Sequence, residues 1–265
     1  MLFELGAYKL LFRNDPVRGW DFLRLWLPGL IRVLAPSAGY GVERMPMTGG
    51  AVLAANHLSA LDPPAIGVYS RRAIRYMTKV ELLQIPVAGE FLRMLGTFAV
   101  RRGEGDRDSL RVARWLVREG HVVGMFIEGT RQKLGYPGPA HSGAAMVAMQ
   151  EGVPVIPVGI DAFGWSLRNP RPFAVAIGEP MDLGGFPGNG RGYKEAAGIV
   201  EAELVRLWRL AAQAVADGLP DQLRDGTPRD PRPRLRDVER PGYPRQWPTE
   251  DWAEEPLGPL YKAIL

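Results

Sequence analysis

Residues 51–62 decide how the rest of this chain folds, and they read Ala51-Val52-Leu53-Ala54-Ala55-Asn56-His57-Leu58-Ser59-Ala60-Leu61-Asp62. The first five form a short apolar run, which predicts a strand buried inside a sheet. His57 and Asp62 follow where that strand ends. A histidine exchanges protons near neutral pH, and a nearby carboxylate can fix its tautomer. The stretch therefore predicts a reaction site at a sheet edge, with a polar helix start as the structural alternative.

Alternating strand and helix patterns continue outward from this stretch. Besides 51–55, we expect strands at 73–77, 96–102, 121–127, 153–160 and 173–177, and helices at 81–95, 108–119, 142–150 and 194–216. This order predicts an α/β fold, with a mostly parallel central sheet flanked by helices. Sites in such sheets gather at the carboxyl ends of the strands.

Three polar clusters follow predicted strands in this way, and they are Asn56-His57, Arg101-Arg102 and Glu128-Gly129-Thr130-Arg131. Arginines can grip a phosphate with two hydrogen bonds, and Lys79 follows another predicted strand. Gly129 allows close approach of a substrate to the backbone. Taken singly, the arginines could be a solvated face and Glu128-Arg131 an internal ion pair. Together the clusters favour a site that binds a phosphate.

The two ends of the chain differ from its middle. Residues 2–12 and 17–34 predict an N-terminal apolar helical hairpin rich in tryptophan and arginine, interrupted at Pro28. Such helices suit docking on a membrane or packing on the core. We therefore expect three parts: residues 1–35 as a membrane-docking segment, 36–217 as the main domain, and 218–265 as a Pro/Arg-rich extension. Within the extension, residues 218–250 should lie over the surface or be partly disordered, and residues 247–265 could dock on the body, a partner or a membrane.

Composition excludes several classes of protein. With 265 residues and no cysteine, the chain has no disulfide, thiolate metal site or cysteine nucleophile. We expect no metal site, since there are only three histidines, and His121 and His141 have no obvious partner. There is no GxxxxGK[ST] phosphate loop and no GxSxG serine motif. The net charge of +4 favours anionic partners, but basic residues do not alternate with aromatic ones, so nucleic acid is not expected.

The sequence also bears on location. It lacks the ~18–20 uninterrupted apolar residues of a spanning helix, and its N-terminus lacks the pattern of a signal peptide. We therefore expect a peripheral protein on the cytoplasmic face of the cell membrane.

Four blocks resemble the glycerophospholipid acyltransferases, a family typified by lysophosphatidic acid acyltransferase. Residues 56–62 resemble the NHxSxxD block, 96–102 the second block with Arg102 at its end, 126–131 the FPEGTR block, and 153–158 the VPIxPV block. The similarity covers roughly residues 40–180. Ile127 replaces a proline, Gln132 a frequent serine and His141-Ser142 a lysine-containing pair, while Arg101 stands at a frequently acidic position.

The resemblance implies O-acyl transfer from an acyl thioester, either acyl-CoA or acyl-carrier protein, to a lysophospholipid hydroxyl in phospholipid biosynthesis. The expected acceptor is 1-acylglycerol-3-phosphate. The implied base is His57, oriented by Asp62, and the implied substrate-binding residues are Lys79, Arg102, Glu128, Gly129, Thr130 and Arg131. No cofactor is required. The alternatives are another lyso-lipid or glycolipid acceptor, a thioesterase, or a non-catalytic protein that binds lipid surfaces.

Overall fold

The computed structural model describes residues 20, 25–31, 33, 35–86, 89, 92, 97–100, 107–166 and 168–230. Within these residues, seven strands form one sheet in the order β1-β7-β6-β2-β5-β3-β4. The strands are β1 (Ser37–Tyr40), β2 (Ala51–Ala55), β3 (Ile74–Lys79), β4 (Phe98–Val100), β5 (Val122–Phe126), β6 (Val155–Asp161) and β7 (Phe173–Ile177). All neighbours pair in parallel except β6 and β7, which are antiparallel. The predicted mostly parallel α/β sheet is confirmed.

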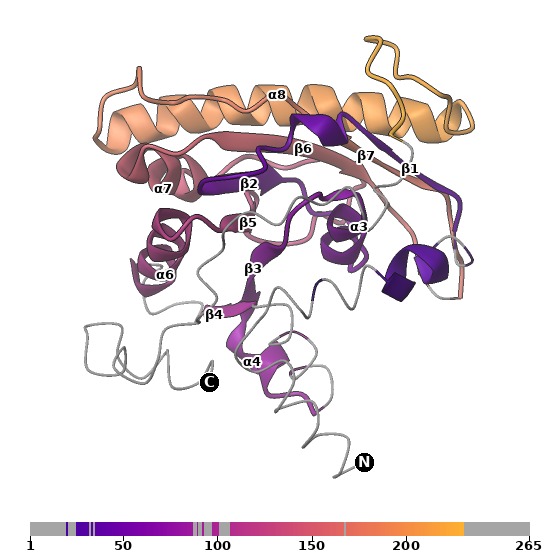
Figure 1. Cartoon of the computed structure of the whole chain (residues 1–265), viewed down its shortest axis with the longest axis horizontal. Helices are drawn as coiled ribbons and strands as arrows, with labels where there is room; N and C mark the ends of the chain where they lie inside the picture. The colour runs from indigo at the N-terminus through magenta and orange to yellow at the C-terminus, as the bar shows by residue number, and fades with distance from the viewer. Residues whose placement is uncertain are drawn as a thin grey trace.

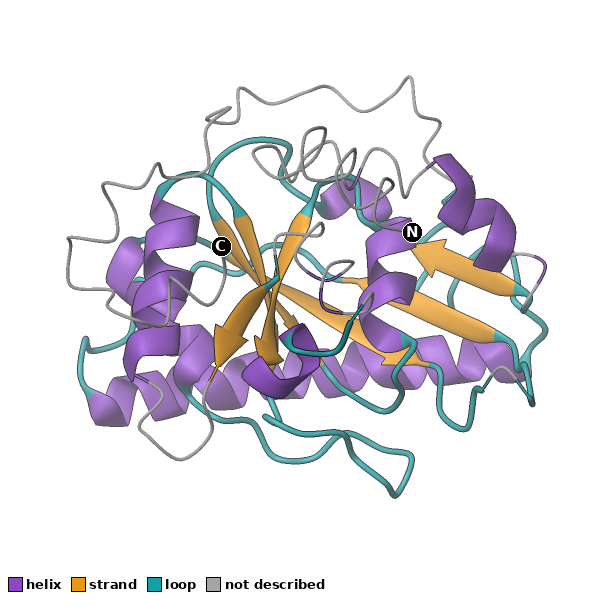
Figure 2. Ribbon diagram, turned by 90° about the horizontal axis from the view of Figure 1, so that it is seen from below, coloured by secondary structure: helices purple, strands orange, loops and turns teal. Residues whose placement is uncertain are grey.

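Helices cover both faces of this sheet (Figure 1). The described helices are α3 (Asp62–Tyr69), α4 (Val80–Leu83), α6 (Arg107–Arg118), α7 (Gly143–Glu151) and α8 (Gly190–Ala216), with the short 3-10 helix η1 (Val42–Arg44) after β1. Figure 2 shows α8 running across the sheet beneath the strands. None of the described helices is long and apolar enough to cross a membrane.

Alternate side chains of β2 enter two different cores. Ala51, Leu53 and Ala55 join the cluster that contains α3, and Val52 and Ala54 join the cluster that contains α6, α7 and α8. This follows from the two-residue period of a strand. All five residues are buried, as expected for a central parallel strand. The strand therefore delivers its carboxyl end to a fixed position at the sheet edge.

The long helix α8 packs very closely on β6. A Cβ atom on Gly159 of β6 would lie 2.1 Å from the backbone nitrogen of Trp208 on α8, so only glycine fits there. At the start of α8, the side chain of Asn189 accepts hydrogen bonds from the N–H groups of Arg191 and Gly192, each at 3.1 Å. This cap starts the helix four residues before the predicted position 194, because the sequence pattern marked the apolar stripe rather than the cap.

The chain returns to the sheet after α8. Tyr40 donates its hydroxyl to the carbonyl of Pro220 at 2.8 Å, and Leu219 and Leu223 are buried with the alanines of β7 and α8. Residues up to 230 therefore pack on the body, although their composition alone suggested a surface segment. The rest of the predicted extension lies outside the described residues, and the division at residue 217 stays a prediction.

Most of the predicted N-terminal hairpin also lies outside the described residues. Residues 25–31 are helical, and Trp20 and Ile31 are buried in the cluster on the α3 side of the sheet. Leu25 and Val33 are instead 68% and 85% exposed. The described part of this segment thus combines both sequence-based alternatives, since one side packs on the core and the other presents apolar side chains to solvent.

Candidate active site

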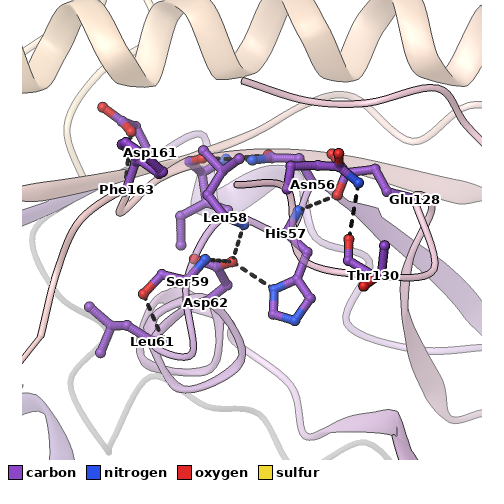
Figure 3. Close-up of polar contacts among 12 residues, drawn as sticks. Asn56, His57, Leu58, Ser59, Leu61, Asp62, Glu128, Thr130, Asp161 and Phe163 are labelled. Atoms are coloured by element: carbon purple, nitrogen blue, oxygen red, sulfur yellow. Dashed lines mark hydrogen bonds and ion pairs between the residues drawn. The ribbon is translucent and has the colours of Figure 1, made fainter. Parts of the chain in front are cut away.

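His57 and Asp62 meet at the carboxyl end of β2. The imidazole Nδ1 lies 2.8 Å from Asp62 Oδ2 (Figure 3). Asp62 is the first residue of α3, and a tight turn brings the chain back, with the Asp62 N–H donating to the carbonyl of Ser59 at 3.3 Å. Pro63 and Pro64 fit the first turn of the helix because it needs no N–H donors there. Two residues five positions apart in the sequence thus come into direct contact.

The carboxylate of Asp62 is held by three donors on one oxygen. Oδ2 accepts the N–H groups of Leu58 at 2.7 Å and Ser59 at 2.8 Å, in addition to the imidazole. Because Oδ2 of an ionised carboxylate can only accept hydrogen bonds, Nδ1 must be the donor in its contact with Oδ2. The proton of the neutral imidazole therefore lies on Nδ1. This leaves the lone pair of Nε2 to take a proton from a substrate.

Burial sets the electrostatics of this pair. Asp62 is fully buried, and burial raises its pKa above the usual value, while the hydrogen bond from His57 opposes the rise most strongly. Asp62 Oδ1 has no hydrogen-bond partner among the described residues. The His57 side chain is 18% exposed, so a substrate can reach it.

A stack of aromatic rings orients the imidazole. The His57 ring lies on Phe126 of β5 with centroids 4.0 Å apart and planes 18° apart, and Phe126 stacks on Tyr76 of β3 at 5.7 Å. Tyr76 needs the glycine opposite it, because a Cβ on Gly124 would lie 2.5 Å from its ring. The sequence interpretation missed Tyr76, since an aromatic residue in a predicted strand carries no sign of the ring it will contact.

Asn56 fixes the end of β2 in the sheet. Its side chain donates to the carbonyl of Ile160 and accepts from the N–H of the same residue, both at 2.8 Å, and it is fully buried. The amide therefore replaces a peptide unit and ties β2 to β6 immediately before His57. Sequence interpretation gave Asn56 no separate role.

Glu128 binds the backbone on both sides of the site. Its Oε2 accepts the N–H of His57 at 2.7 Å, and its Oε1 accepts the N–H of Gly138 at 3.0 Å. Burial raises the pKa of Glu128 to about 7, and the two backbone N–H groups oppose that rise. The predicted carboxylate thus lies beside His57, and each of its oxygens already accepts a backbone hydrogen bond.

The next three predicted residues form an exposed turn beside His57. Gly129 has a φ of +66°, a value that favours glycine, and Gly129, Thr130 and Arg131 are all exposed. The N–H of Gln132 donates to the carbonyl of His57 at 2.8 Å. The turn is therefore fixed next to the imidazole, with an arginine available to solvent.

The remaining predicted cations are less completely described. Lys79 is the last residue of β3, opposite Val100 of β4, and its side chain lies outside the described set. Arg102 lies outside the described residues altogether. Of the other histidines, His121 is buried, and its burial with Arg75 and Arg72 lowers its pKa to about 3, whereas His141 is exposed next to Gly129.

Comparisons with known proteins identify the family. Residues 38–161 match the Acyltransferase family model. The 1-acyl-sn-glycerol-3-phosphate acyltransferase of Bacillus subtilis is 31% identical over 150 residues, covering 56% of this chain and 74% of the relative. The lyso-ornithine lipid O-acyltransferase of Pseudomonas aeruginosa is 32% identical over 141 residues, covering 52% of each. This chain therefore spans about half the length of that second relative.

A solved structure shares the fold. The 1-acyl-sn-glycerophosphate acyltransferase PlsC of Thermotoga maritima superposes with a TM-score of 0.58 at 24% identity, over 71% of this chain and 79% of the other. The alignment with the Bacillus protein covers most of that relative. The four motif blocks, at residues 56–62, 96–102, 126–131 and 153–158, all lie within the stretch that matches the family model. The chain belongs to the acyltransferase family.

Proposed function

We propose that this acyltransferase moves a fatty acyl group from an acyl thioester to the free hydroxyl of 1-acylglycerol-3-phosphate in phospholipid biosynthesis. The contact of His57 Nδ1 with Asp62 Oδ2 at 2.8 Å carries the proposal, because it leaves Nε2 as a base at an accessible sheet edge. The similarity to the Bacillus relative supports the choice of acceptor.

His57 Nε2 accepts the proton of the acceptor hydroxyl while the hydroxyl oxygen attacks the thioester carbonyl carbon. Asp62 stabilises the imidazolium that forms. The tetrahedral intermediate collapses, its C–S bond breaks, and His57 returns the proton to the departing thiolate. No acyl-enzyme intermediate is needed. Backbone N–H groups near 96–102, or Lys79, are the proposed donors to the oxyanion.

The acceptor phosphate and glycerol bind on the cationic side of the site. Arg131 projects from the turn beside His57 and, with Gly129 and Thr130, is the proposed contact for the phosphate. Lys79, the last residue of β3, and Arg102, two positions after β4 in the sequence, are proposed to add positive charge. Glu128 contributes by fixing the His57 backbone and by accepting a hydrogen bond from the glycerol portion.

The acyl donor carries the same thioester whether the carrier is coenzyme A or acyl-carrier protein. The acceptor resides in a membrane, so we propose that the protein binds peripherally to the cytoplasmic face. The exposed apolar residues of 25–33 support this docking. The lyso-ornithine lipid acyltransferase among the relatives makes that lipid the second candidate acceptor.

The test is a mass-spectrometric assay of the purified protein with one acyl-CoA or acyl-carrier protein and a panel of lyso-lipids. Acylated 1-acylglycerol-3-phosphate is the expected product. His57→Ala is expected to lower kcat by about 10²–10⁴-fold, the usual contribution of a general base. Asp62→Asn should also lower kcat, with the KM for the acceptor little changed, because it misorients the imidazole.

Matched thermal unfolding of both variants separates lost chemistry from lost folding. Acyl transfer at the wild-type rate by His57→Ala would contradict the proposed mechanism. Free fatty acid released equally with and without acceptor would identify a thioesterase instead. Vesicle binding without turnover of any donor would identify a non-catalytic lipid-binding protein.

A further inference from the structure

Two loops beside the site expose apolar side chains that have no part in the proposed chemistry. The first, residues 129–141, is anchored next to His57, because Gln132 N–H donates to the His57 carbonyl at 2.8 Å and Gly138 N–H donates to Glu128 Oε1 at 3.0 Å. The residues between these anchors leave the site and return to it. The second, residues 161–171, begins at the end of β6, and Figure 3 shows Asp161 and Phe163 on the same sheet edge as His57.

The tips of the two loops touch. A Cβ on Gly135 would come within 3.0 Å of the Phe163 ring, so the ring lies against the backbone of the first loop. The residues on either side of Gly135 are Leu134, 73% exposed, and Tyr136, 52% exposed, while Phe163 is 42% exposed. These three exposed side chains lie on two loops that touch, and we call them the loop patch.

Four exposed cations lie on the same two loops. Arg131 and Lys133 lie on the first loop and Arg168 and Arg171 on the second, and all four are exposed. The guanidinium of Arg171 would be 3.4 Å from a Cβ on Gly164, next to Phe163. In the sequences of the two loops, Asp161 is the single acidic residue, and its partly buried carboxylate accepts the N–H of Phe163 at 3.4 Å. The two loops therefore carry exposed apolar side chains together with a net positive charge.

We propose that the loop patch is a second membrane-docking surface, which inserts Leu134, Tyr136 and Phe163 among anionic lipids next to the reaction centre. The inference rests on the proposed function. Apolar and aromatic side chains enter the boundary between headgroups and acyl chains, and nearby arginines and lysines pair with anionic headgroups. The first loop is hydrogen-bonded to His57, so docking there places the acceptor hydroxyl close to the base.

The position of the N-terminal helix favours a membrane over a small acidic carrier protein. Leu27 of that helix and Trp165 of the second loop both pack against the same buried cluster on the α3 side of the sheet. The segment at residues 25–33 and the second loop thus adjoin the same buried cluster, and each also exposes apolar side chains. An extended lipid surface can contact both, and it satisfies the positive charge of both loops.

The absence of cysteine from the chain allows a direct test. Leu134→Cys and Phe163→Cys in the full chain each take one environment-sensitive fluorophore, and Ile199→Cys, 51% exposed on α8, serves as the matched control. With phosphatidylcholine–phosphatidylglycerol vesicles, emission from positions 134 and 163 should shift to the blue and position 199 should not respond. No shift at 134 and 163, or an equal shift at 199, would overturn the proposal. A shift produced by acyl-carrier protein but not by vesicles would also overturn it, by assigning the patch to a protein.

A kinetic comparison separates this inference from the proposed function. The variant Leu134→Ser/Tyr136→Ser/Phe163→Ser should lose about 10-fold or more of its activity toward acceptor presented in anionic vesicles, because three apolar side chains no longer insert. Its kcat with a short-chain, monomeric lyso-lipid should stay unchanged. Equal losses with both substrates would contradict docking by the loop patch. Wild-type protein inactive toward the monomeric lyso-lipid would instead refute the proposed function.

Discussion

Hydrogen bonds to Asp62 and Glu128 hold His57 in place, in addition to the stack of its ring on Phe126. The carboxylate of Asp62 holds the imidazole ring of His57, and the carboxylate of Glu128 accepts the backbone N–H of His57 at 2.7 Å. Both carboxylates are buried, so their hydrogen bonds are poorly exchanged with water and hold the ring through a reaction cycle. The residue that performs the proposed chemistry is thereby restrained at two points.

Glu128 predicts a particular pH dependence of stability. Burial raises its pKa to about 7 from an ordinary value near 4.5, so between these pH values the folded state binds more protons than the unfolded state. The free energy of unfolding that Glu128 contributes is fully present below about pH 4.5 and falls as the pH rises through about 7. Glu128→Gln cannot titrate, so its stability should lack this decline.

Urea unfolding of both proteins at pH 5 and at pH 8 measures the effect. The stability of wild type relative to Glu128→Gln should be lower at pH 8 than at pH 5 by about 1–3 kcal/mol. Both proteins carry the same other titrating groups, so the contributions of those groups cancel in the difference. The glutamine amide has one acceptor oxygen fewer than the carboxylate, and this loss lowers the stability equally at both pH values. A constant difference would show that Glu128 keeps an ordinary pKa.

At the scale of elements, the site depends on how β2 joins β6. Asn56 closes this junction with two hydrogen bonds to Ile160, one as donor and one as acceptor. Each strand would otherwise end with polar backbone groups buried away from water. The junction therefore determines both the edge of the sheet and the position of the next residue, His57.

Asn56→Ala should destabilise the fold by roughly 2–5 kcal/mol, because it leaves two buried backbone groups of Ile160 unpaired at about 1–3 kcal/mol each. Chemical denaturation measures this, and kcat should fall as His57 loses its support. Gln150→Ala, which removes an exposed hydrogen bond to Tyr193, is the control and should change stability by less than about 0.5 kcal/mol. Equal effects of the two substitutions would rule out a structural role for Asn56.

At the scale of the whole molecule, the N-terminal helix joins the core to the proposed membrane. Trp20 packs so closely on α3 that a Cβ on Gly67 would lie 2.6 Å from its ring, and Ile31 is also buried. Leu25, Leu30 and Val33 are instead 68%, 42% and 85% exposed. Removing residues 1–35 would therefore remove core contacts together with any anchor.

Substitution of the exposed side chains alone separates these two roles. Leu25→Ser/Leu30→Ser/Val33→Ser should weaken sedimentation with anionic vesicles by at least about 10-fold, since burying even one such side chain is worth ~1.5–3 kcal/mol. Its Tm should remain close to that of wild type. Ile31→Ser is the matched control, because it should lower Tm by exposing a gap in the core. Unchanged sedimentation of the triple variant would assign the helix to the core alone.

The sequence by itself determined the α/β class, the strands at 51–55 and 173–177, and three residues that meet at the sheet edge, His57, Asp62 and Glu128. Local patterns suffice for these features, since apolar runs record burial and parallel strands bring their carboxyl ends together. Four ordered motifs were also enough to indicate the family. These local patterns could not predict the order of the strands in the sheet or the antiparallel pairing of β6 and β7.

Only the tertiary structure decided how the site residues meet. It brought Nδ1 of His57 to Asp62, stacked Phe126 and Tyr76 behind the imidazole, and joined Asn56 to Ile160 across 104 positions of sequence. It also gave Glu128 two backbone partners and brought Phe163 against Gly135. Each of these contacts depends on which strands are neighbours and on how tightly loops close. Residue patterns along one chain do not contain that information, because the free energy that selects it comes from packing between distant segments.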